Sequence, residues 1–192
     1  MIYILLPAYN EERDIGPLMR RIRQAMHHLG ERYAVLVVND GSTDKTAQVV
    51  AAFGQEMPVE LIDHGSNKGL GQAMLSGLRR AAAVLQDEDV LVAMDADNTH
   101  DPLLIGQMLQ EIQSGADLVI ASRYAEGGQE VGLSGARSLL SRGASALLRL
   151  FFPIPGARDY TCGYRAYRGK TLRKAYQVYG GRLVEESGFT CM

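Results

Sequence analysis

The chain alternates short apolar runs with longer stretches in which apolar residues recur every three or four positions. Runs of the first kind predict buried β-strands, and stretches of the second kind predict amphipathic helices. The predicted strands span residues 2–6, 34–38, 59–62, 90–94 and 118–121, and a further short strand after Gly163 closes with residues 166–168. The predicted helices span residues 43–53, 70–85 and 101–113, preceded by a first helix that begins at Asn10 or Glu11 and ends near Leu29.

Strands separated by helices of these lengths predict a mostly parallel sheet with right-handed crossovers, because a crossover between parallel strands leaves room for a helix. The expected fold class is therefore α/β, a Rossmann-like sheet flanked by helices. The first predicted helix agrees with this, since its apolar residues fall on one face: Ile15, Leu18, Met19, Ile22 and Met26. With 192 residues and no linker, repeat or low-complexity segment, residues 1–192 form one predicted domain.

The amino-acid composition limits which binding partners and which cellular location are expected for this protein. The chain carries 20 Lys and Arg against 22 Asp and Glu, so no overall positive field attracts nucleic acid, and a nucleic-acid partner is disfavoured. The cysteines, Cys162 and Cys191, have no metal-binding spacing and suit a reducing cytoplasm. No apolar run approaches the roughly 20 residues of a membrane span. The expected location is the cytoplasm, and peripheral binding to the inner face of the membrane stays open.

The most informative segment is residues 90–97, an apolar run that ends in Asp95 and Asp97. In an open α/β sheet, ligands bind at the carboxyl edge of the strands, where these acids are expected. Strand alternation turns both carboxylates to one side of the chain and Ala96 to the other. Converging carboxylates repel each other unless a cation lies between them, and a hard divalent ion that also binds a diphosphate fits this place. The alternative for an isolated Asp-x-Asp triplet is a solvated loop.

Polar residues also follow the other predicted strands. Tyr9 offers a flat face for a base, and Glu11 can accept a hydrogen bond from a base or a ribose. Asp40 suits the hydrogen-bonding edge of uracil or guanine, Lys68 suits a phosphate or the base, and Arg123 suits an anion. Each also has a purely structural interpretation, as a helix cap, a turn residue or an exposed loop residue. Their common position, at one edge of the predicted sheet, is what indicates a site.

Two common nucleotide-binding motifs are absent from the sequence. It contains neither a GxxxxGK[ST] phosphate loop nor a GxGxxG loop after the first strand. Their absence argues against a P-loop NTPase and against a dinucleotide-dependent oxidoreductase. The lack of a Gly-rich loop after the first strand also disfavours a nucleotidyltransferase.

The motifs at the strand ends occur in a definite order. They are residues 7–11 (Pro-Ala-Tyr-Asn-Glu), 39–44 (Asn-Asp-Gly-Ser-Thr-Asp), 67–71 (Asn-Lys-Gly-Leu-Gly), 95–97 (Asp-Ala-Asp) and 122–124 (Ser-Arg-Tyr). In this order they resemble the family 2 inverting glycosyltransferases with the GT-A fold, and within that family the polyprenyl-phosphate sugar synthases. The resemblance covers almost the whole chain.

The resemblance implies a nucleotide-diphosphate sugar as donor, either GDP-mannose or a UDP-sugar. The residues it assigns to the donor are Pro7, Tyr9, Glu11, Asp40, Lys68, Gly69, Asp95 and Ala96. It implies a Mg²⁺ or Mn²⁺ ion held by Asp95 and Asp97. The candidate catalytic residues are Asp97, Arg123 and Asp159, and the candidate acceptor contacts are Arg123 and Arg137.

The chain departs from the family pattern in three places. The family often has two successive Asp residues where this chain has Asn39 and Asp40, so Asp40 alone would contact the base. Thr99 stands where the subgroup often has Gln, which leaves a third metal ligand open. The resemblance implies a further helix and strand after residue 192, and the Gln-x-x-Arg-Trp box of processive members is absent.

The sequence favours a phosphate as the acceptor. A phosphate monoester has a second pKa of about 6 and needs no general base at neutral pH, and Asp159 is the one candidate base. Residues 136–152 combine apolar residues at helical spacing with Arg137, Arg142 and Arg149. This pattern is typical of a membrane-surface helix, and equally of a helix packed on its own protein.

The leading hypothesis is an inverting transfer of a mannose- or glucose-type sugar to a polyprenyl (dolichyl-type) phosphate. Within the same fold, the alternative is a soluble glycosyltransferase that acts on a hydroxyl of a glycan or small molecule. From another class, the alternative is a non-catalytic module that binds a nucleotide sugar.

Overall fold

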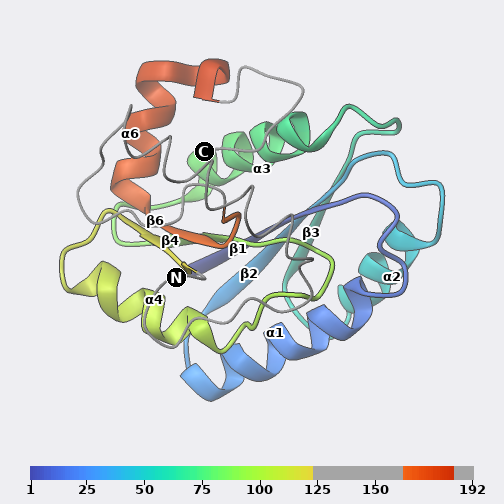
Figure 1. The fold of residues 1–192 in the computed structure, drawn as a ribbon, viewed down its shortest axis with the longest axis horizontal. Helices are drawn as coiled ribbons and strands as arrows, with labels where there is room; N and C mark the ends of the chain where they lie inside the picture. Colours follow the sequence, from blue (N-terminus) through green and yellow to red (C-terminus); the bar gives the residue numbers. More distant parts are fainter. Residues whose placement is uncertain (123–161, 184–192) are drawn as a thin grey trace, which may run out of the picture.

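Six strands of the described residues form one sheet, in the order β3-β2-β1-β4-β6-β5 (Figure 1). The computed structural model describes residues 1–122 and 162–183. The strands are β1 (Ile2–Ala8), β2 (Tyr33–Asn39), β3 (Val59–Asp63), β4 (Val90–Ala93), β5 (Leu118–Ile120) and β6 (Arg165–Arg168). The helices are α1 (Ile15–Leu29), α2 (Thr46–Phe53), α3 (Leu70–Val84), α4 (Leu104–Gln113) and α6 (Gly169–Tyr179), followed by the 3₁₀ helix η1 (Gly180–Leu183).

The sheet is mostly parallel, as predicted. β1 lies between β2 and β4 and pairs with both in parallel, and β2 pairs in parallel with β3. β6 runs antiparallel to β4 and to β5, so it separates two strands that share one direction. The apolar pattern of residues 166–168 predicts a strand there but not this direction.

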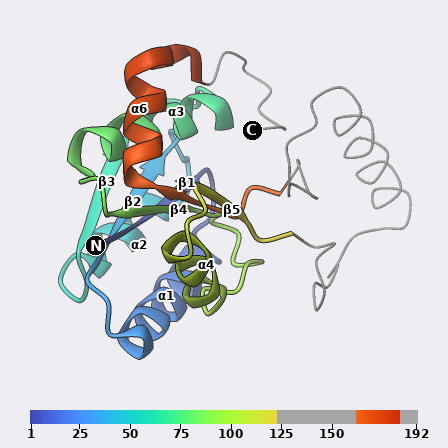
Figure 2. The ribbon, with the colours of Figure 1, turned by 90° about the vertical axis from the view of Figure 1, so that its left-hand side faces the viewer.

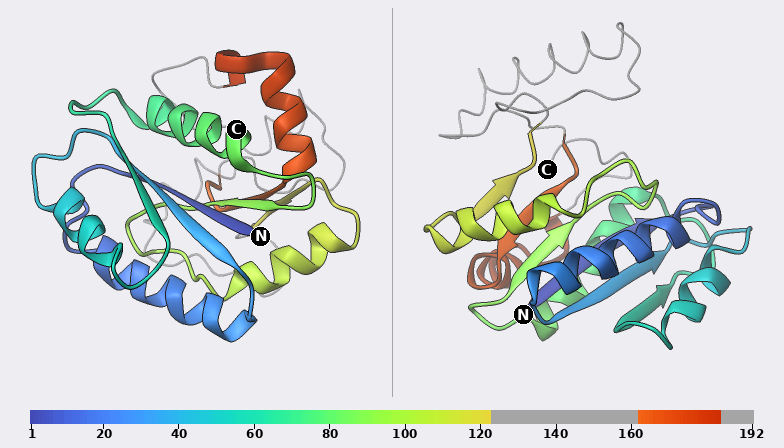
Figure 3. Two further views of the ribbon diagram at one scale, coloured as in Figure 1. Left: turned by 180° about the vertical axis from the view of Figure 1, so that it is seen from behind. Right: turned by 90° about the horizontal axis from the view of Figure 1, so that it is seen from below.

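Helices cover both faces of the sheet (Figure 2). On one face, Ile4 and Leu6 of β1 share a buried core with Leu18 and with residues of α2 and α4. On the other face, Leu5 of β1 shares a second core with Leu78 of α3 and with a residue of α6. β1 is thus buried on both faces, which explains its unbroken apolar sequence. Viewed from below in Figure 3, the layer of α1, α2 and α4 lies in front of the sheet.

The first helix begins later than predicted. α1 starts at Ile15, although its predicted apolar face is buried as expected. Asn10 has a φ of 58°, in the left-handed region that Asn tolerates, and its N–H donates to Ser42 Oγ at 2.9 Å. The N–H of Glu11 donates to Thr46 Oγ1 at 2.8 Å. These long-range hydrogen bonds hold residues 10 and 11 in a loop.

The second helix also begins later than predicted. α2 starts at Thr46, and neither Ser42 nor Thr43 caps it, because both contact Asn10 instead. Asp44 instead binds the first residue of the helix. Its Oδ1 accepts from the Thr46 N–H at 2.9 Å and from the Thr46 hydroxyl at 2.5 Å. The sequence pattern identified the polar residues of this turn but not their partners.

Two further features differ from the sequence expectation. The helix predicted over residues 101–113 begins at Leu104, after a turn in which the Leu104 N–H donates to the Asp101 carbonyl. α6 and η1 follow residue 168, where no helix was predicted. Among the described residues, no helix has the length and apolar character needed to cross a membrane.

A close approach at Gly169 gives a prediction about stability. Gly169 begins α6 directly after β6, and a Cβ there would lie 2.2 Å from the Gln86 carbonyl oxygen, which is backbone and cannot rotate away. We expect Gly169→Ala to lower the free energy of unfolding by about 1–3 kcal/mol, measured by urea denaturation. Gly181→Ala is the matched control, because nothing lies within 4 Å of its Cβ position. An equal effect of both substitutions would contradict this steric explanation.

Candidate functional site

The carboxyl edge of the sheet brings distant segments together. β1, β2, β3 and β4 are parallel, so the segments that follow them leave the sheet at one edge. β6 begins at the same edge, because Arg165 pairs with Ala93 at the end of β4. Open α/β sheets bind ligands at this edge. The polar residues singled out in the sequence that belong to the described part of the chain therefore lie where a ligand is expected.

Hydrogen bonds join the loops after β1 and β2. Asn10 Oδ1 accepts from the Thr43 N–H at 2.8 Å. The Glu12 N–H donates to Asp44 Oδ2 at 3.1 Å, and Glu12 Oε2 accepts from the Lys45 N–H at the same distance. The two loops thus form one platform. Tyr9, at the start of the first loop, is 44% exposed, as a base-stacking surface requires.

Asp95 and Asp97 follow β4, and each has a defined neighbour. Asp95 Oδ2 lies 3.1 Å from His100 Nε2, so the imidazole can orient this carboxylate. Asp97 Oδ1 accepts from the Thr99 N–H at 3.0 Å and from the Thr99 hydroxyl at 2.6 Å. Both carboxylates keep exposed surface, whereas Ala96 between them is buried. Thr99, at the position where a third metal ligand was left open in the sequence, therefore orients the Asp97 carboxylate through two hydrogen bonds.

The loop that carries these acids is held from two elements. Asn98 adopts a φ of 60°, and Arg21 of α1 donates to its Oδ1 at 2.8 Å. From the other side, the Tyr164 hydroxyl donates to the Asp101 carbonyl at 3.0 Å. Gly163 leaves room for Asp95, because a Cβ there would lie 3.2 Å from Asp95 Oδ1. The residues before β6 therefore form one wall of the site.

Glu11 lies close enough to Asp95 and Asp97 for their charges to change its pKa. Burial raises the pKa of Glu11 above its ordinary value, and the negative charges of Asp97, Asp14, Asp44 and Asp95 raise it further. Acidic side chains thus gather at this edge of the sheet. A bound cation would lower the repulsion between their charges.

The donor set suits a hard divalent ion. Among residues 1–122 and 162–183, no group of three or more His, Cys, Asp or Glu side chains is placed to hold a metal by itself. Asp95 and Asp97 offer two carboxylates at the open edge, and Mg²⁺ commonly uses one or two protein carboxylates together with water and phosphate oxygens. The residues therefore fit an ion shared with a diphosphate ligand.

The raised pKa of Glu11 predicts a pH-dependent effect on stability. An acid whose folded-state pKa lies above its unfolded value destabilises the fold once both states are ionised. In metal-free buffer, Glu11→Gln should therefore increase the free energy of unfolding at pH 7, and the gain should vanish as the pH falls below 4.5, the ordinary pKa of a glutamate. Glu31→Gln, at an exposed position between α1 and β2, is the control. A gain that persists at low pH would contradict the charge explanation.

Asp40 lies at the end of β2 as predicted, but its side chain is only 4% exposed. Its Oδ1 accepts from the Lys68 N–H at 2.9 Å, and its Oδ2 accepts from the Gly69 N–H at 2.8 Å. The sequence predicted an Asp40 carboxylate that faces a base. In the structure, this carboxylate instead accepts hydrogen bonds from N–H groups of the protein itself. Any effect of Asp40 on a bound nucleoside therefore passes through the loop of Lys68 and Gly69.

The other sequence-predicted residues divide into two groups. Pro7 is buried in β1, Lys68 is exposed, and Gly69, with a φ of 89°, precedes α3. Arg123, Arg137 and Asp159, like residues 136–152, lie outside the described residues, so their expected roles stay predictions.

Sequence reasoning did not single out His64, His100 or Gly163 as site residues. His100 carries a usable signal, because it lies in the same loop as Asp95 and Asp97. His64 follows β3 directly and so shares the strand-end position that drew attention to Asp40. The contact of Gly163 with Asp95 joins residues far apart in the chain and has no local signal.

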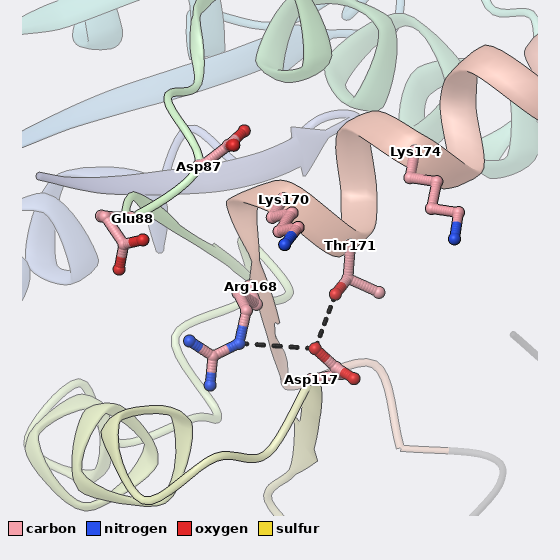
Figure 4. Close-up of a pocket in the computed structure, with 7 residues that line it drawn as sticks. All are labelled: Asp87, Glu88, Asp117, Arg168, Lys170, Thr171 and Lys174. Atoms are coloured by element: carbon pink, nitrogen blue, oxygen red, sulfur yellow. Dashed lines mark hydrogen bonds and ion pairs between the residues drawn. The ribbon is translucent and has the colours of Figure 1, made fainter.

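A cavity of about 530 Å³ lies away from this site (Figure 4). It adjoins the amino end of β4, because Arg168 pairs with Val90. Arg168 Nε lies 3.4 Å from Asp117 Oδ1, which also accepts from the Thr171 hydroxyl at 2.7 Å. Its lining mixes acids and bases: Asp87, Glu88, Asp117, Arg168, Lys170, Thr171 and Lys174. Acids and bases that neutralise one another in this lining do not form a site specific for an anion or for a cation.

The fold matches solved glycosyltransferases of the GT-A type. Glucosyl-3-phosphoglycerate synthase from Mycobacterium tuberculosis, crystallised with Mn²⁺, UDP and phosphoglyceric acid, superposes with a TM-score of 0.63 at 22% identity, over 94% of this chain and 66% of that one. Mannosyl-3-phosphoglycerate synthase from Rubrobacter xylanophilus gives 0.66 at 23% identity, over 88% of this chain and 53% of that one. These similarities establish the fold alone.

The sequence establishes the family. The model of glycosyl transferase family 2 matches residues 3–175, so the chain belongs to that family. It is 33% identical over 172 residues to the dolichol-phosphate mannosyltransferase of Pyrococcus furiosus, covering 89% of this chain and 47% of the relative. It is 36% identical over 177 residues to the polyprenol monophosphomannose synthase of Mycolicibacterium smegmatis, covering 89% and 63%. The chain thus spans about half to two thirds of these relatives.

Proposed function

We propose that this chain carries the donor site of a metal-dependent inverting glycosyltransferase that transfers a sugar from a nucleotide-diphosphate sugar to a polyprenyl phosphate. The observation that carries the proposal is the convergence of Asp95, Asp97 and Glu11 at the carboxyl edge of the sheet. The loop of Lys68 and Gly69 leaves the sheet at the same edge. Two carboxylates can bind a divalent ion, and the exposed Lys68 side chain can bind a phosphate of the nucleotide sugar.

The residues have distinct roles in the proposed reaction. Asp95 and Asp97 would hold the Mg²⁺ or Mn²⁺ ion, oriented by His100 and Thr99. When bound, such an ion neutralises charge that grows on the departing diphosphate. Tyr9 presents its ring to the base, and the exposed Lys68 presents its charge to the phosphates. Arg123 is the candidate for a further contact to these phosphates.

The acceptor is proposed from chemistry and from the relatives. A phosphate acceptor attacks as a dianion, so the site needs residues that bind its charge rather than a strong base. Arg123 and Arg137 are the candidates to bind it, and Asp159 the candidate to orient it. Relatives at 33–36% identity are named for dolichol, polyprenol or undecaprenyl phosphate and for mannose. We therefore propose GDP-mannose as the first donor to test and a UDP-sugar as the second.

A lipid acceptor places the reaction at a membrane surface. We propose that the protein works in the cytoplasm, bound peripherally to the inner face of the membrane. Residues 136–152, with their three arginines and their apolar positions, are the candidate contact.

The alternative acceptor is a hydroxyl of a small molecule. The phosphoglycerate synthases with the same fold favour it, but they share only 22–23% identity with this chain. The stronger sequence similarity supports the lipid phosphate.

A transfer assay tests the proposal. The protein is incubated with Mn²⁺ and radiolabelled GDP-mannose or UDP-glucose, with polyprenyl phosphate in detergent or with phosphoglyceric acid. We expect label in the organic phase, and none with Asp97→Asn. Label only in a water-soluble product would favour the soluble transferase. Donor binding without transfer or hydrolysis would favour a non-catalytic module.

A further inference from the structure

A chain of hydrogen bonds runs from α3 to the loop that follows β3. Asp40 Oδ1 lies 2.7 Å from His64 Nδ1, and His64 Nε2 lies 2.8 Å from Ser76 Oγ. The side chains of Asp40 and His64 are 4% and 6% exposed. The three residues follow β2, follow β3 and lie within α3, so the network ties three elements together.

The chemistry of these groups sets the direction of the hydrogen bonds. A carboxylate only accepts, so His64 Nδ1 carries the proton that it donates to Asp40. Nε2, the other ring nitrogen, forms the hydrogen bond with the Ser76 hydroxyl. With both nitrogens engaged, the buried ring cannot turn without leaving a polar group unsatisfied. Serine hydrolases use the same residue types, but a histidine this deeply buried cannot meet a substrate.

The network ends on the backbone of the loop at the carboxyl edge. Asp40 receives the N–H groups of Lys68 and Gly69, at 2.9 and 2.8 Å. Gly41, with a φ of 67°, packs on the same loop, because a Cβ there would lie 2.2 Å from the Ser66 carbonyl carbon. The loop is therefore held both by a buried hydrogen-bond acceptor and by a close backbone contact.

We propose that His64 is a positioning residue for donor binding: it fixes the Asp40 carboxylate, which holds the Lys68–Gly69 loop in the conformation that binds the nucleoside diphosphate. Ser76 supports the far side of the ring. This inference rests on the proposed function, because it presumes that the loop contacts the donor. In this proposal, Ser76 of α3 affects donor affinity through His64 and does not itself contact the ligand.

Two substitutions separate the two nitrogens of His64. The amide of Asn can reach the place of Nδ1, so His64→Asn keeps the hydrogen bond to Asp40. The amide of Gln reaches the place of Nε2, so His64→Gln loses it. We expect His64→Gln to raise the Kd for GDP with Mn²⁺ about tenfold, and His64→Asn to raise it far less. Ser76→Ala should act in the same direction as His64→Gln, with a smaller effect.

Amide hydrogen exchange, resolved by residue, gives a readout that does not depend on the ligand. In His64→Gln the Lys68 and Gly69 amides should exchange faster than in the wild type, while amides of α1 keep their rates. In steady-state assays KM should rise with kcat nearly unchanged. His28→Gln, at an exposed position on α1, is the matched control. Ser76→Ala provides the answer if His64→Gln does not fold.

The outcomes distinguish the inference from the proposed function. If the wild type binds GDP or UDP with Mn²⁺, and the His64 and Ser76 variants match it in Kd and in exchange at Lys68 and Gly69, the inference is wrong. If the wild type binds neither nucleotide, the proposed function is wrong, and the donor role of His64 falls with it.

Discussion

Asp97→Asn is expected to lower kcat for sugar transfer about a thousandfold while the protein stays folded. The carboxylate is exposed, and an Asn Oδ1 can still accept from Thr99, so the substitution costs little stability. The change removes one of two negative charges available to a divalent ion. Charge on the departing diphosphate would then lack its main stabilisation. Steady-state kinetics with saturating Mn²⁺ and thermal unfolding measure the two effects.

Two comparisons sharpen this experiment. Asp95→Asn should weaken metal and donor binding together, because the neutral amide replaces the carboxylate that faces His100. Glu88→Gln, an exposed acid near the amino end of β4, should change neither kcat nor KM. Transfer by Asp97→Asn at a rate close to that of the wild type would contradict the assignment of this residue.

Asp40→Ala is expected to raise KM for the donor about thirtyfold and to change kcat by less than about threefold. The substitution leaves the N–H groups of Lys68 and Gly69 and the His64 ring without their buried acceptor. The loop then loses its fixed conformation, and binding in the ground state and in the transition state weakens alike. The free energy of unfolding should fall by about 1–3 kcal/mol for the same reason.

Asp63→Ala is the control for Asp40, because Asp63 ends the neighbouring strand but is exposed. In the described structure its carboxylate accepts hydrogen bonds from the Asn39 side chain and the Gly65 N–H. Its effect on KM should be much smaller. If Asp40→Ala instead lowers kcat with KM unchanged, Asp40 belongs to the reacting centre and the loop explanation is wrong.

The centre of the sheet could be predicted from the sequence because β1, β2 and β4 are buried on both faces. Unbroken apolar runs such as residues 90–94 mark such strands, and the polar residues that follow them mark the carboxyl edge. The same logic located Asp95 and Asp97. It could not give the direction of β6, because a run of this length fits either direction.

The details of the site depend on contacts between residues far apart in the chain. α1 begins at Ile15 because Asn10 and Glu11 bond to residues more than thirty positions away. The direction of the Asp40 carboxylate depends on the N–H groups of a loop 28 residues later. Alternation along a strand predicts which face of the sheet a side chain lies on. It does not predict which hydrogen-bond donors from other segments lie on that face.

The central claim is that Asp95 and Asp97 bind a nucleoside diphosphate through a divalent ion. Isothermal titration calorimetry with GDP and with UDP, in Mn²⁺ and then in EDTA, tests it most directly. We predict that one of the two nucleotides binds in Mn²⁺, and that EDTA and Asp95→Asn each weaken this binding at least about tenfold. An affinity that is the same in EDTA as in Mn²⁺ would contradict the claim.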